Sequence, residues 1–297
     1  MVVTVLLGGL AILALVYVIA LGRTAMARGQ FLPSVEGVTL GALTNFFDTL
    51  GIGSYAPTTA WIKLRRLVPD SYIPTILNAG HGLPTVVEAL IFINLVKVDP
   101  WLLAACIAAA VAGAVVGAPI VVRLPLRVIQ GVVGVALVLA AAAFAATNLP
   151  QLHLMPAGGT ALSLSPPLFA TAVFGYFVFG ALMTCGIGLF APSLILLPLL
   201  GMNPAASFPM MMGACAFLMP VSGIRFLRSE RIDIRLVIGI TLGGIPAVLV
   251  AALLVKSMPL TLLRWGVVVV VLYAAAILLR AAFRQAPIEA AEAATTV

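Results

Sequence analysis

Three ionisable residues, Asp48, His81 and Glu88, lie within long apolar stretches of the chain. An ionised side chain at the centre of a membrane costs at least a few kcal/mol, so each of them needs a partner, a cavity or a bound proton. His81 and Glu88 are seven residues apart, about two turns of a helix, and therefore share one helix face. We predict a proton relay in which Asp48 or Glu88 exchanges protons with His81. Two alternatives stay open: a buried hydrogen-bonded cluster that holds helices together and, for Glu88, a shallow position that reaches the interface.

A glycine–proline pattern occurs twice, as GIGSYAP at 51–57 and as GIGLFAP at 186–192. Glycine accepts positive φ and allows the chain to reverse, and proline fits the first turn of the helix that follows. Each pattern therefore predicts a pair of half-helices whose tip presents a helix N-terminus, where free N–H groups favour an anion. The alternative is that the glycines only allow helices to pack closely. The predicted substrate-binding residues are Gly51, Gly53, Ser54, Tyr55, Thr58, Asn78, His81, Thr184, Gly186, Gly188 and Ser193.

The composition predicts an all-α polytopic membrane protein. Of the 297 residues, 63% are hydrophobic and only 8% are charged, whereas soluble domains average about 25% charged residues. The net charge of +7 is therefore interpreted as a topology signal and not as a nucleic-acid-binding signal. We predict no enzyme, cofactor or metal site, because the chain has two histidines, no CxxC pair and no Walker motif. The enzyme alternative is an intramembrane hydrolase that uses Asp48 or Cys185 with His81 as its base.

The apolar segments form two sets that repeat at an offset of about 135 residues. The matched positions are Gly51, Gly53, Pro57, Pro69 and Pro74 with Gly186, Gly188, Pro192, Pro204 and Pro209, and, one residue closer, Asp99 and Pro125 with Asp233 and Pro259. The predicted helical segments are 36–50, 54–66, 71–96, 101–122 and 126–146, followed by 168–185, 188–200, 205–227, 235–255 and 260–280. We predict a leading membrane helix and loop (1–34), transport repeat 1 (35–146), an extracytoplasmic linker (147–166), transport repeat 2 (167–284) and a disordered tail (285–297).

The 16 Lys and Arg residues distinguish two ways of threading each repeat through the membrane. If segment 36–66 crosses once, they divide about 9 to 7 between the two sides. If it enters and returns on one side, all except Lys97, Lys256 and Arg264 share a side, a division of 13 to 3. Cytoplasmic loops collect Lys and Arg, so we predict re-entrant hairpins, seven full crossings, an outside N-terminus and a cytoplasmic C-terminus. Each repeat then has an odd number of crossings, which inverts one repeat relative to the other, as in many secondary transporters.

Three stretches carry a resemblance to a known family: GALTNFFDTLGIGSYAP, its repeat GALMTCGIGLFAP, and LVPDSYIPTILNAGHGLP at 67–84. They resemble the TauE/SafE family of sulfite and sulfonate exporters, also called the toluene-sulfonate uptake permease (TSUP) family, over residues 35–282. The chain departs from the family's glycine-rich patch, because Ser54 or Leu189 stands where a third glycine is usual. The resemblance implies transport of small sulfur-containing or carboxylate anions across the bacterial inner membrane, by import or by export.

We therefore predict a secondary transporter for sulfite, thiosulfate or an organosulfonate, coupled to protons and working by alternating access. Its expected partners are the small anionic substrate, a coupling proton or Na⁺, and the lipid bilayer, and a homo-oligomer is left open. The proton-coupling residues are predicted to be Asp48, His81 and Glu88. The alternative functions are a passive anion channel and a sodium-coupled transporter of a small carboxylate.

Overall fold

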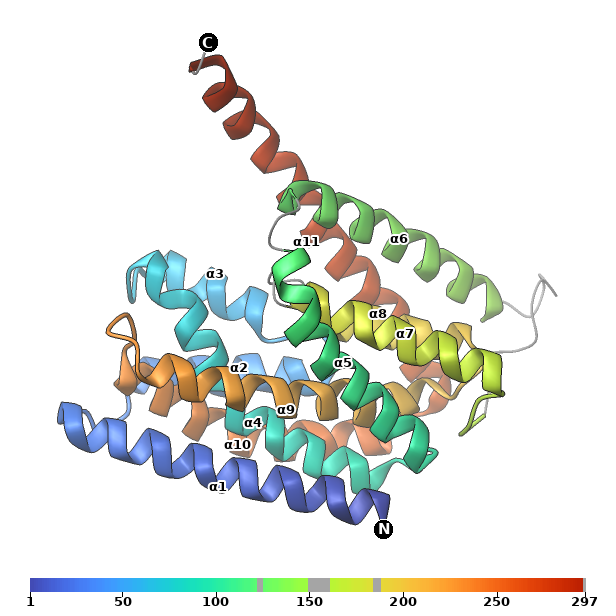
Figure 1. The fold of residues 1–297 in the computed structure, drawn as a ribbon, viewed down its shortest axis with the longest axis horizontal. Coiled ribbons are helices and arrows are strands. Elements are labelled where there is room, and N and C mark those ends of the chain that lie inside the picture. The colour runs from blue at the N-terminus through green and yellow to red at the C-terminus, as the bar shows by residue number, and fades with distance from the viewer. Residues whose placement is uncertain (122–124, 149–160, 184–187, 296–297) are drawn as a thin grey trace. The chain divides into compact units, whose positions relative to one another are not determined.

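The computed structural model describes residues 1–121, 125–148, 161–183 and 188–295, with side chains described except at 117–121, 126 and 284–295. Within these residues the chain is built of α-helices joined by short connections, which confirms the predicted all-α class (Figure 1). The α-helices are α1 (Val2–Arg28), α2 (Val35–Thr49), α3 (Tyr55–Arg65), α4 (Ile73–Leu95), α5 (Pro100–Val121), α6 (Leu126–Thr147), α7 (Pro166–Met183), α8 (Phe190–Leu199), α9 (Ser207–Leu227), α10 (Ile234–Ser257) and α11 (Leu260–Thr295). Two 3-10 helices, η1 (Asp70–Tyr72) and η2 (Pro204–Ala206), precede α4 and α9.

The order of the elements after α1 occurs twice along the chain. The series α2, α3, η1, α4, α5, α6 is followed by α7, α8, η2, α9, α10, α11, with short helices at the second place of each series. This order agrees with the predicted duplication. The inversion of one repeat relative to the other stays a prediction.

Two aspartates at equivalent places in the repeats begin equivalent helices. Oδ1 of Asp99 accepts hydrogen bonds from the backbone N–H groups of Trp101 and Leu102, each at 2.8 Å, at the start of α5. Oδ1 of Asp233 accepts one from the backbone N–H of Leu236 at 3.0 Å, at the start of α10. The first N–H groups of a helix have no partner within it, and an aspartate here supplies one. The repeated aspartates are therefore helix caps.

Seven helices of the described chain are long and apolar enough to cross a membrane, which is the number that the charge pattern predicts. The set differs from the predicted one at one place. The sequence predicts α7 as half of a hairpin, but α7 has 18 residues and is long and apolar enough to cross; α5, a predicted crossing, has side chains described only over Pro100–Val116, which form an apolar helical segment. The full set is α1, η1 with α4, α6, α7, η2 with α9, α10 and the apolar part of α11.

The helices on either side of the first glycine pattern, and the one after the second, are too short to cross. α2 has 15 residues, α3 has 11 and α8 has 10. At a rise of about 1.5 Å per residue, none of them spans the roughly 30 Å of hydrocarbon. These lengths suit half-helices. A re-entrant course in the membrane stays a prediction for both hairpins.

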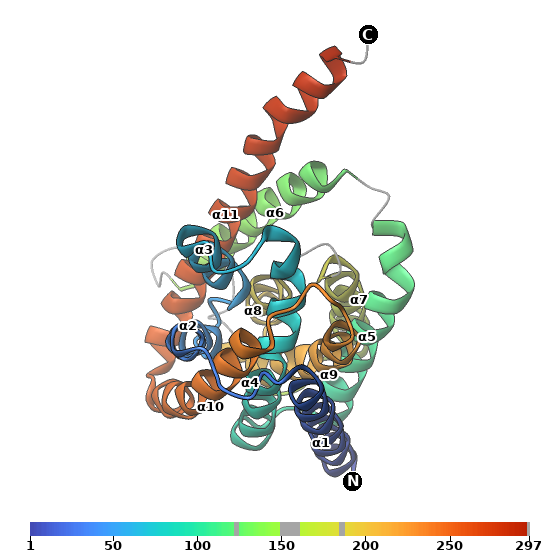
Figure 2. The same cartoon turned by 90° about the vertical axis from the view of Figure 1, so that its left-hand side faces the viewer.

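The chain folds into two compact units, and each unit combines helices from both halves of the sequence. Unit 1 consists of Met1–Ile107 with Phe208–Met258, and unit 2 of Ala108–Ser207 with Pro259–Val297. In unit 1, α2 lies along α10, as Figure 2 shows. Gly41 of α2 sits against the backbone of Ile240, and Gly243 of α10 against the backbone of Val38, so neither position has room for a Cβ.

Unit 2 repeats this pairing with the equivalent helices. Gly113 of α5 sits against the backbone of Phe177, and Gly180 of α7 against the backbone of Ala110. In both units, then, the first helix of one repeat packs against the fourth α-helix of the other, and glycines allow the two backbones to touch. This is the small-residue packing typical of membrane helices.

The last helix extends further than the sequence predicts. The apolar segment is expected to end near residue 280 and to be followed by a disordered tail, but α11 continues to Thr295. The continuation is rich in alanine and glutamate, which have high helix propensities. α11 therefore continues beyond its apolar part, Leu260–Phe283.

The close approach of α2 and α10 gives a test of the packing. Replacing Gly243 with alanine places a Cβ against the carbonyl of Val38, and a backbone group cannot move aside as a flexible side chain can. We expect Gly243→Ala to lower the free energy of unfolding by roughly 1–3 kcal/mol, measured from thermal unfolding in detergent. The control is Gly8→Ala on α1, where a Cβ meets no atom within 4 Å. Equal unfolding temperatures for the two variants would contradict this account of the α2–α10 contact.

Candidate functional site

The first glycine pattern breaks the chain between α2 and α3 inside unit 1. Gly51 has φ 92° and Gly53 has φ 89°, both in the left-handed region that favours glycine. The backbone N–H of Gly51 donates to the carbonyl of Asp48 at 2.7 Å, and that of Ile52 donates to the carbonyl of Phe47 at 3.1 Å. This pair of bonds is a Schellman motif, which ends a helix by satisfying its last carbonyls. The predicted role of these two glycines in reversing the chain is confirmed.

Seven buried polar residues gather at this break, and we call them the tip cluster. Each is at most 3% exposed. They come from the end of α2, the start of α3 and the middle of α4. The members are Asn45, Asp48, Thr49, Ser54, Thr58, His81 and Glu88.

Asp48 lies at the N-terminus of α3. Ser54 is the residue that precedes α3, and its hydroxyl donates to Oδ2 of Asp48 at 3.0 Å. Pro57 falls in the first turn of α3, as predicted, where its missing N–H removes no helical bond. A carboxylate is stabilised at this end of a helix by the dipole and by free N–H groups. The protein's own Asp48 therefore occupies the kind of place that the sequence assigns to a bound anion.

Glu88 contacts the end of α2 through Thr49. The Thr49 hydroxyl oxygen is 2.8 Å from Oε1 of Glu88 and 2.8 Å from the backbone carbonyl oxygen of Asn45. Glu88 has no exposed surface within the fold. The alternative that it reaches the membrane interface from a shallow position is wrong, because α2 and α4 enclose it.

His81 is held from both sides by neutral groups. Nδ1 of His81 lies 2.9 Å from Oδ1 of Asn45, and Nε2 lies 3.0 Å from the hydroxyl oxygen of Thr58. The side-chain N–H of Asn45 donates to the carbonyl of Gly41 at 2.8 Å, which leaves Oδ1 to accept. Nδ1 must then carry a hydrogen, and in a neutral ring Nε2 accepts from Thr58. His81 bonds to neither carboxyl group, so the direct exchange with Asp48 or Glu88 that the relay requires has no hydrogen bond in this conformation.

Neither carboxyl group of the cluster has a basic partner. The ion pair Arg65–Glu36 joins the outer ends of α2 and α3, and Lys63–Asp70 joins α3 to the connection before α4. Both pairs lie away from the tip cluster. Oδ1 of Asp48 and Oε2 of Glu88 have no hydrogen-bond partner. Because a buried unpaired charge costs several kcal/mol, the pair of carboxyl groups must hold at least one proton or other cation. Among the described residues no group of three or more His, Cys, Asp or Glu is placed to bind a metal ion.

Tyr55 and Asn78 form a smaller contact beside the cluster. The Tyr55 hydroxyl donates to Oδ1 of Asn78 at 3.1 Å, and the Tyr55 ring centroid is 6.3 Å from that of His81. Both residues are partly exposed. The structure therefore brings together all the predicted site residues of the first repeat.

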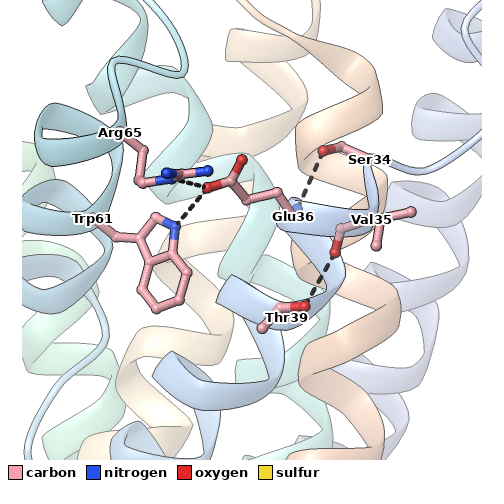
Figure 3. A network of polar contacts seen from close by, with 7 residues as sticks. Ser34, Val35, Glu36, Thr39, Trp61 and Arg65 are labelled. Carbon is pink, nitrogen blue, oxygen red and sulfur yellow. Dashed lines mark hydrogen bonds and ion pairs between the residues drawn. The ribbon is translucent and has the colours of Figure 1, made fainter.

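The outer ends of α2 and α3 also meet, so α3 leads the chain back to the start of α2. Oε1 of Glu36, in the first turn of α2, accepts from Nε of Arg65 at 2.8 Å and from the indole N–H of Trp61 at 3.2 Å (Figure 3). These two donors, Arg65 first, lower the pKa of the Glu36 carboxyl group. The Arg65 side chain is 62% exposed, so the ion pair itself adds little stability. The contact closes the hairpin at the end opposite the tip.

The second glycine pattern lies in unit 2 and is described only in part. Thr184 and Gly186, two predicted site residues, lie outside the described residues, as does Cys185. Gly188 is exposed. The predicted start of the next helix is confirmed: Leu189 precedes α8 and Pro192 lies in its first turn. Ser193, in the same turn, is buried and its hydroxyl has no hydrogen-bond partner.

Two kinds of glycine are distinguished by their surroundings. A Cβ at Gly41 or Gly243 would meet backbone atoms, whereas a Cβ at Gly53 or Gly188 would meet no atom within 4 Å. Close helix packing therefore does not explain Gly53 and Gly188, which occupy matching positions of the two patterns. Both have open space beside them, two residues before the first residue of each short helix.

Sequence reasoning missed Asn45 as a member of the site and did not include Thr49 among the substrate-binding residues. Both lie on the buried face of α2 together with Asp48, which is three residues after Asn45, while Thr49 is four residues after it. Residues at these spacings share a helix face. A search for polar residues in register with Asp48 would have found them.

Comparisons with known proteins find a match to one family model. The model of the sulfite exporter TauE/SafE family matches residues 168–297, which confirms the family resemblance over the second half of the chain. No curated protein and no solved structure gives a significant match. The matched residues form α7 to α11, whereas the members of the tip cluster come from α2, α3 and α4 and the turn between α2 and α3. Two of the matched helices, α9 and α10, pack beside the cluster.

The bridge from Asn45 to His81 gives a stability test. Asn45→Leu removes the acceptor for His81 Nδ1 and the side-chain donor to the carbonyl of Gly41, and leaves the buried Nδ1–H of His81 without a partner. We expect a loss of roughly 1–3 kcal/mol in unfolding free energy, measured by denaturation in detergent. Asn94→Leu is the matched control, because Asn94 makes the same bond to the carbonyl four residues earlier at an exposed site of α4. If Asn45→Leu costs no more than the control, the bridge does not stabilise the cluster.

Proposed function

We propose that this chain, which matches the TauE/SafE sulfite exporter family over residues 168–297, is a secondary transporter that moves a small sulfur oxyanion together with protons. The family match and the seven apolar helices support a multi-pass membrane transport protein for sulfur-containing anions in general. The choice among sulfite, thiosulfate and an organosulfonate, the proton coupling and the alternating-access mechanism are the parts that we add. The proposed location is the bacterial inner membrane.

The observation that carries the proposal is the open space beside Gly53 and Gly188. Each of these glycines precedes a short helix that begins within its own unit and does not span a membrane by length. An anion beside such an N-terminus accepts hydrogen bonds from backbone N–H groups and is favoured by the helix dipole. An oxyanion is therefore recognised without a buried lysine or arginine, which a membrane interior disfavours.

A hydroxyl group at one of these N-termini supplies a further donor. Ser193 lies in the first turn of α8 and its hydroxyl has no partner, whereas Ser54 and Thr58 at the start of α3 already donate to Asp48 and His81. Neutral donors of this kind suit a sulfur oxyanion, whose oxygens accept several hydrogen bonds at once. The same donors also accept a carboxylate, so the family match is what favours sulfur compounds.

Asp48 provides the reason for proton coupling. Its carboxylate takes the hydrogen bond of Ser54 at the N-terminus of α3, where the substrate anion would also bind. Two anions at one helix terminus repel each other, so protonation of Asp48 favours entry of the substrate. Proton and anion then bind together and leave together. A passive channel does not require this competition between the Asp48 carboxylate and the substrate anion.

Alternating access would follow from movement about the hairpin tips, as in transporters with inverted repeats. Within each unit, α2 or α7 is braced by a helix from the other repeat through backbone contact at glycines. We propose that these braced pairs move as rigid bodies. The glycine tips then provide the flexible points.

Asp48→Asn tests the coupling. Asparagine keeps the acceptor for Ser54 but cannot exchange a proton, so we expect ³⁵S-thiosulfate uptake into proteoliposomes to lose its response to an imposed pH gradient. Asp70→Asn is the control, because Asp70 is exposed and paired with Lys63 outside the cluster. An undiminished response to the pH gradient in Asp48→Asn would exclude Asp48 as the coupling group. Failure of the wild-type protein to accumulate substrate against its gradient would favour the channel.

Gly53→Leu tests the tip as the binding site. The substitution fills the open space and forces a side chain onto a backbone at φ 89°. We expect calorimetric binding of thiosulfate or sulfite to weaken at least tenfold. Gly22→Leu is the control, because it also points into open space but from α1, at ordinary helical φ. Equal affinity in the two variants, with Gly53→Leu shown to be folded by its unfolding temperature, would place the substrate elsewhere.

A further inference from the structure

The Thr49 hydroxyl lies between two oxygen atoms that both normally accept. One is the carbonyl oxygen of Asn45 and the other is Oε1 of Glu88, each at 2.8 Å. A hydroxyl group has one hydrogen to donate and lone pairs that accept. If Glu88 were ionised, only one of these two short contacts would contain a full hydrogen bond. The other would bring two electron-rich oxygens together in a buried site.

The hydrogen of Thr49 has a preferred partner in this chain. Thr44, one turn earlier on α2, donates to the carbonyl of Leu40 at 2.7 Å, and Thr24 on α1 donates to the carbonyl of Ala20 at 2.9 Å. Donation to the carbonyl four residues earlier is the usual bond of a helical threonine. By the same geometry Thr49 donates to Asn45. The short contact with Glu88 then requires that Glu88 supplies the hydrogen.

We infer that Glu88 is a protonated carboxylic acid that donates a hydrogen bond to the Thr49 hydroxyl, and that Asp48 alone exchanges protons during transport. The inference rests on the proposed function for the role of Asp48, and on the two contacts of Thr49 for the state of Glu88. The proton on Glu88 is taken from water when the protein folds and is retained through the cycle. Glu88 is thus a positioning residue that fixes the end of α2 beside the tip.

The surroundings of Glu88 favour the neutral acid. The ionisable side chains that interact with Glu88 are Asp48 on α2 and Cys215 on α9. Farther off, Tyr55 on α3 lies near Asp48 and Cys215, Tyr17 on α1 contacts α4 at the carbonyl of Ala79, and His81 lies two turns away on α4 itself. The buried face of α10 that packs on α4 brings no ionisable side chain. None of these groups is a fixed cation. Loss of the proton would therefore add a second buried negative charge near Asp48.

The two carboxyl groups differ in their hydrogen bonds. Oδ2 of Asp48 accepts from the Ser54 hydroxyl, as an ionised carboxylate does, and lies at a helix N-terminus that stabilises negative charge. Oε1 of Glu88 faces a hydroxyl whose hydrogen is already used. One group is thus arranged to accept and the other to donate. The cluster then holds one proton, which satisfies the requirement that its two carboxyl groups cannot both be ionised.

Infrared spectroscopy tests the protonation state directly in the purified full-length protein. We expect the wild type at neutral pH to show the carbonyl-stretch band of a protonated carboxylic acid, and Glu88→Gln to lack it. Thr49→Val removes the acceptor without a large change of shape, and we expect it to shift the band. Thr44→Val is the matched control, because the Thr44 hydroxyl contacts the carbonyl of Leu40 and no carboxyl group. Absence of the band in the wild type, or its loss in Asp48→Asn but not in Glu88→Gln, overturns the inference.

Transport measurements separate this inference from the proposed function. Glutamine retains an N–H that donates to Thr49, so we expect Glu88→Gln to keep the wild-type pH profile of thiosulfate flux. Glu88→Ala loses the bond, and we expect its flux to fall on the order of tenfold relative to Glu88→Gln. A pH profile altered in Glu88→Gln would make Glu88 a coupling group and overturn the inference. A normal pH response in Asp48→Asn, with the Glu88 band intact, would instead overturn the proposed coupling and leave the state of Glu88 established.

Discussion

A helix that ends inside an apolar interior must find partners for its free backbone groups, and this constraint shapes the centre of unit 1. α2 ends at Thr49, where the chain is buried, and α3 begins six residues later at Tyr55. The Schellman bonds of Gly51 and Ile52 satisfy carbonyls of α2, and Ser54 links the start of α3 to Asp48. Without these partners each unpaired group would cost on the order of 1–3 kcal/mol. The break is stable because the residues around it are polar.

The same polar residues make the break chemically useful. Hydrogen bonds from hydroxyl and amide groups fix Asn45, Thr49 and Thr58, so that these side chains hold His81 and Glu88 in place. Within the tip cluster, only the carboxyl groups of Asp48 and Glu88 keep an oxygen without a hydrogen-bond partner. In an otherwise satisfied network, these oxygens are where a proton or a ligand gains the most. Structural and functional roles are therefore divided within one cluster.

Much of the fold follows from local signals in the sequence. Gly51, Gly53 and Pro57 determine where α2 ends and α3 begins, because positive φ and a missing N–H act within a few residues, and the predicted bounds agree with the structure to within a residue or two. The contacts of the cluster are different in kind. That Thr49 meets Glu88 and that Asn45, rather than a carboxyl group, meets His81 depends on how α2 is rotated against α4. That rotation is set by packing against α10, which is about 200 residues away in sequence.

The two kinds of glycine show how the fold combines rigidity with freedom. Gly41 and Gly243 bring α2 and α10 into backbone contact, and this contact fixes the axis and rotation of α2. Gly53, twelve residues after Gly41 on the same hairpin, has open space beside it and a backbone that turns through positive φ. In the sequence both are glycines in apolar stretches, and only their neighbours in space separate them. Asp48 lies between the two, on the helix in backbone contact with α10 and next to the turn at Gly51 and Gly53. In the proposed transport cycle, a change in the charge of Asp48 would therefore act at this turn.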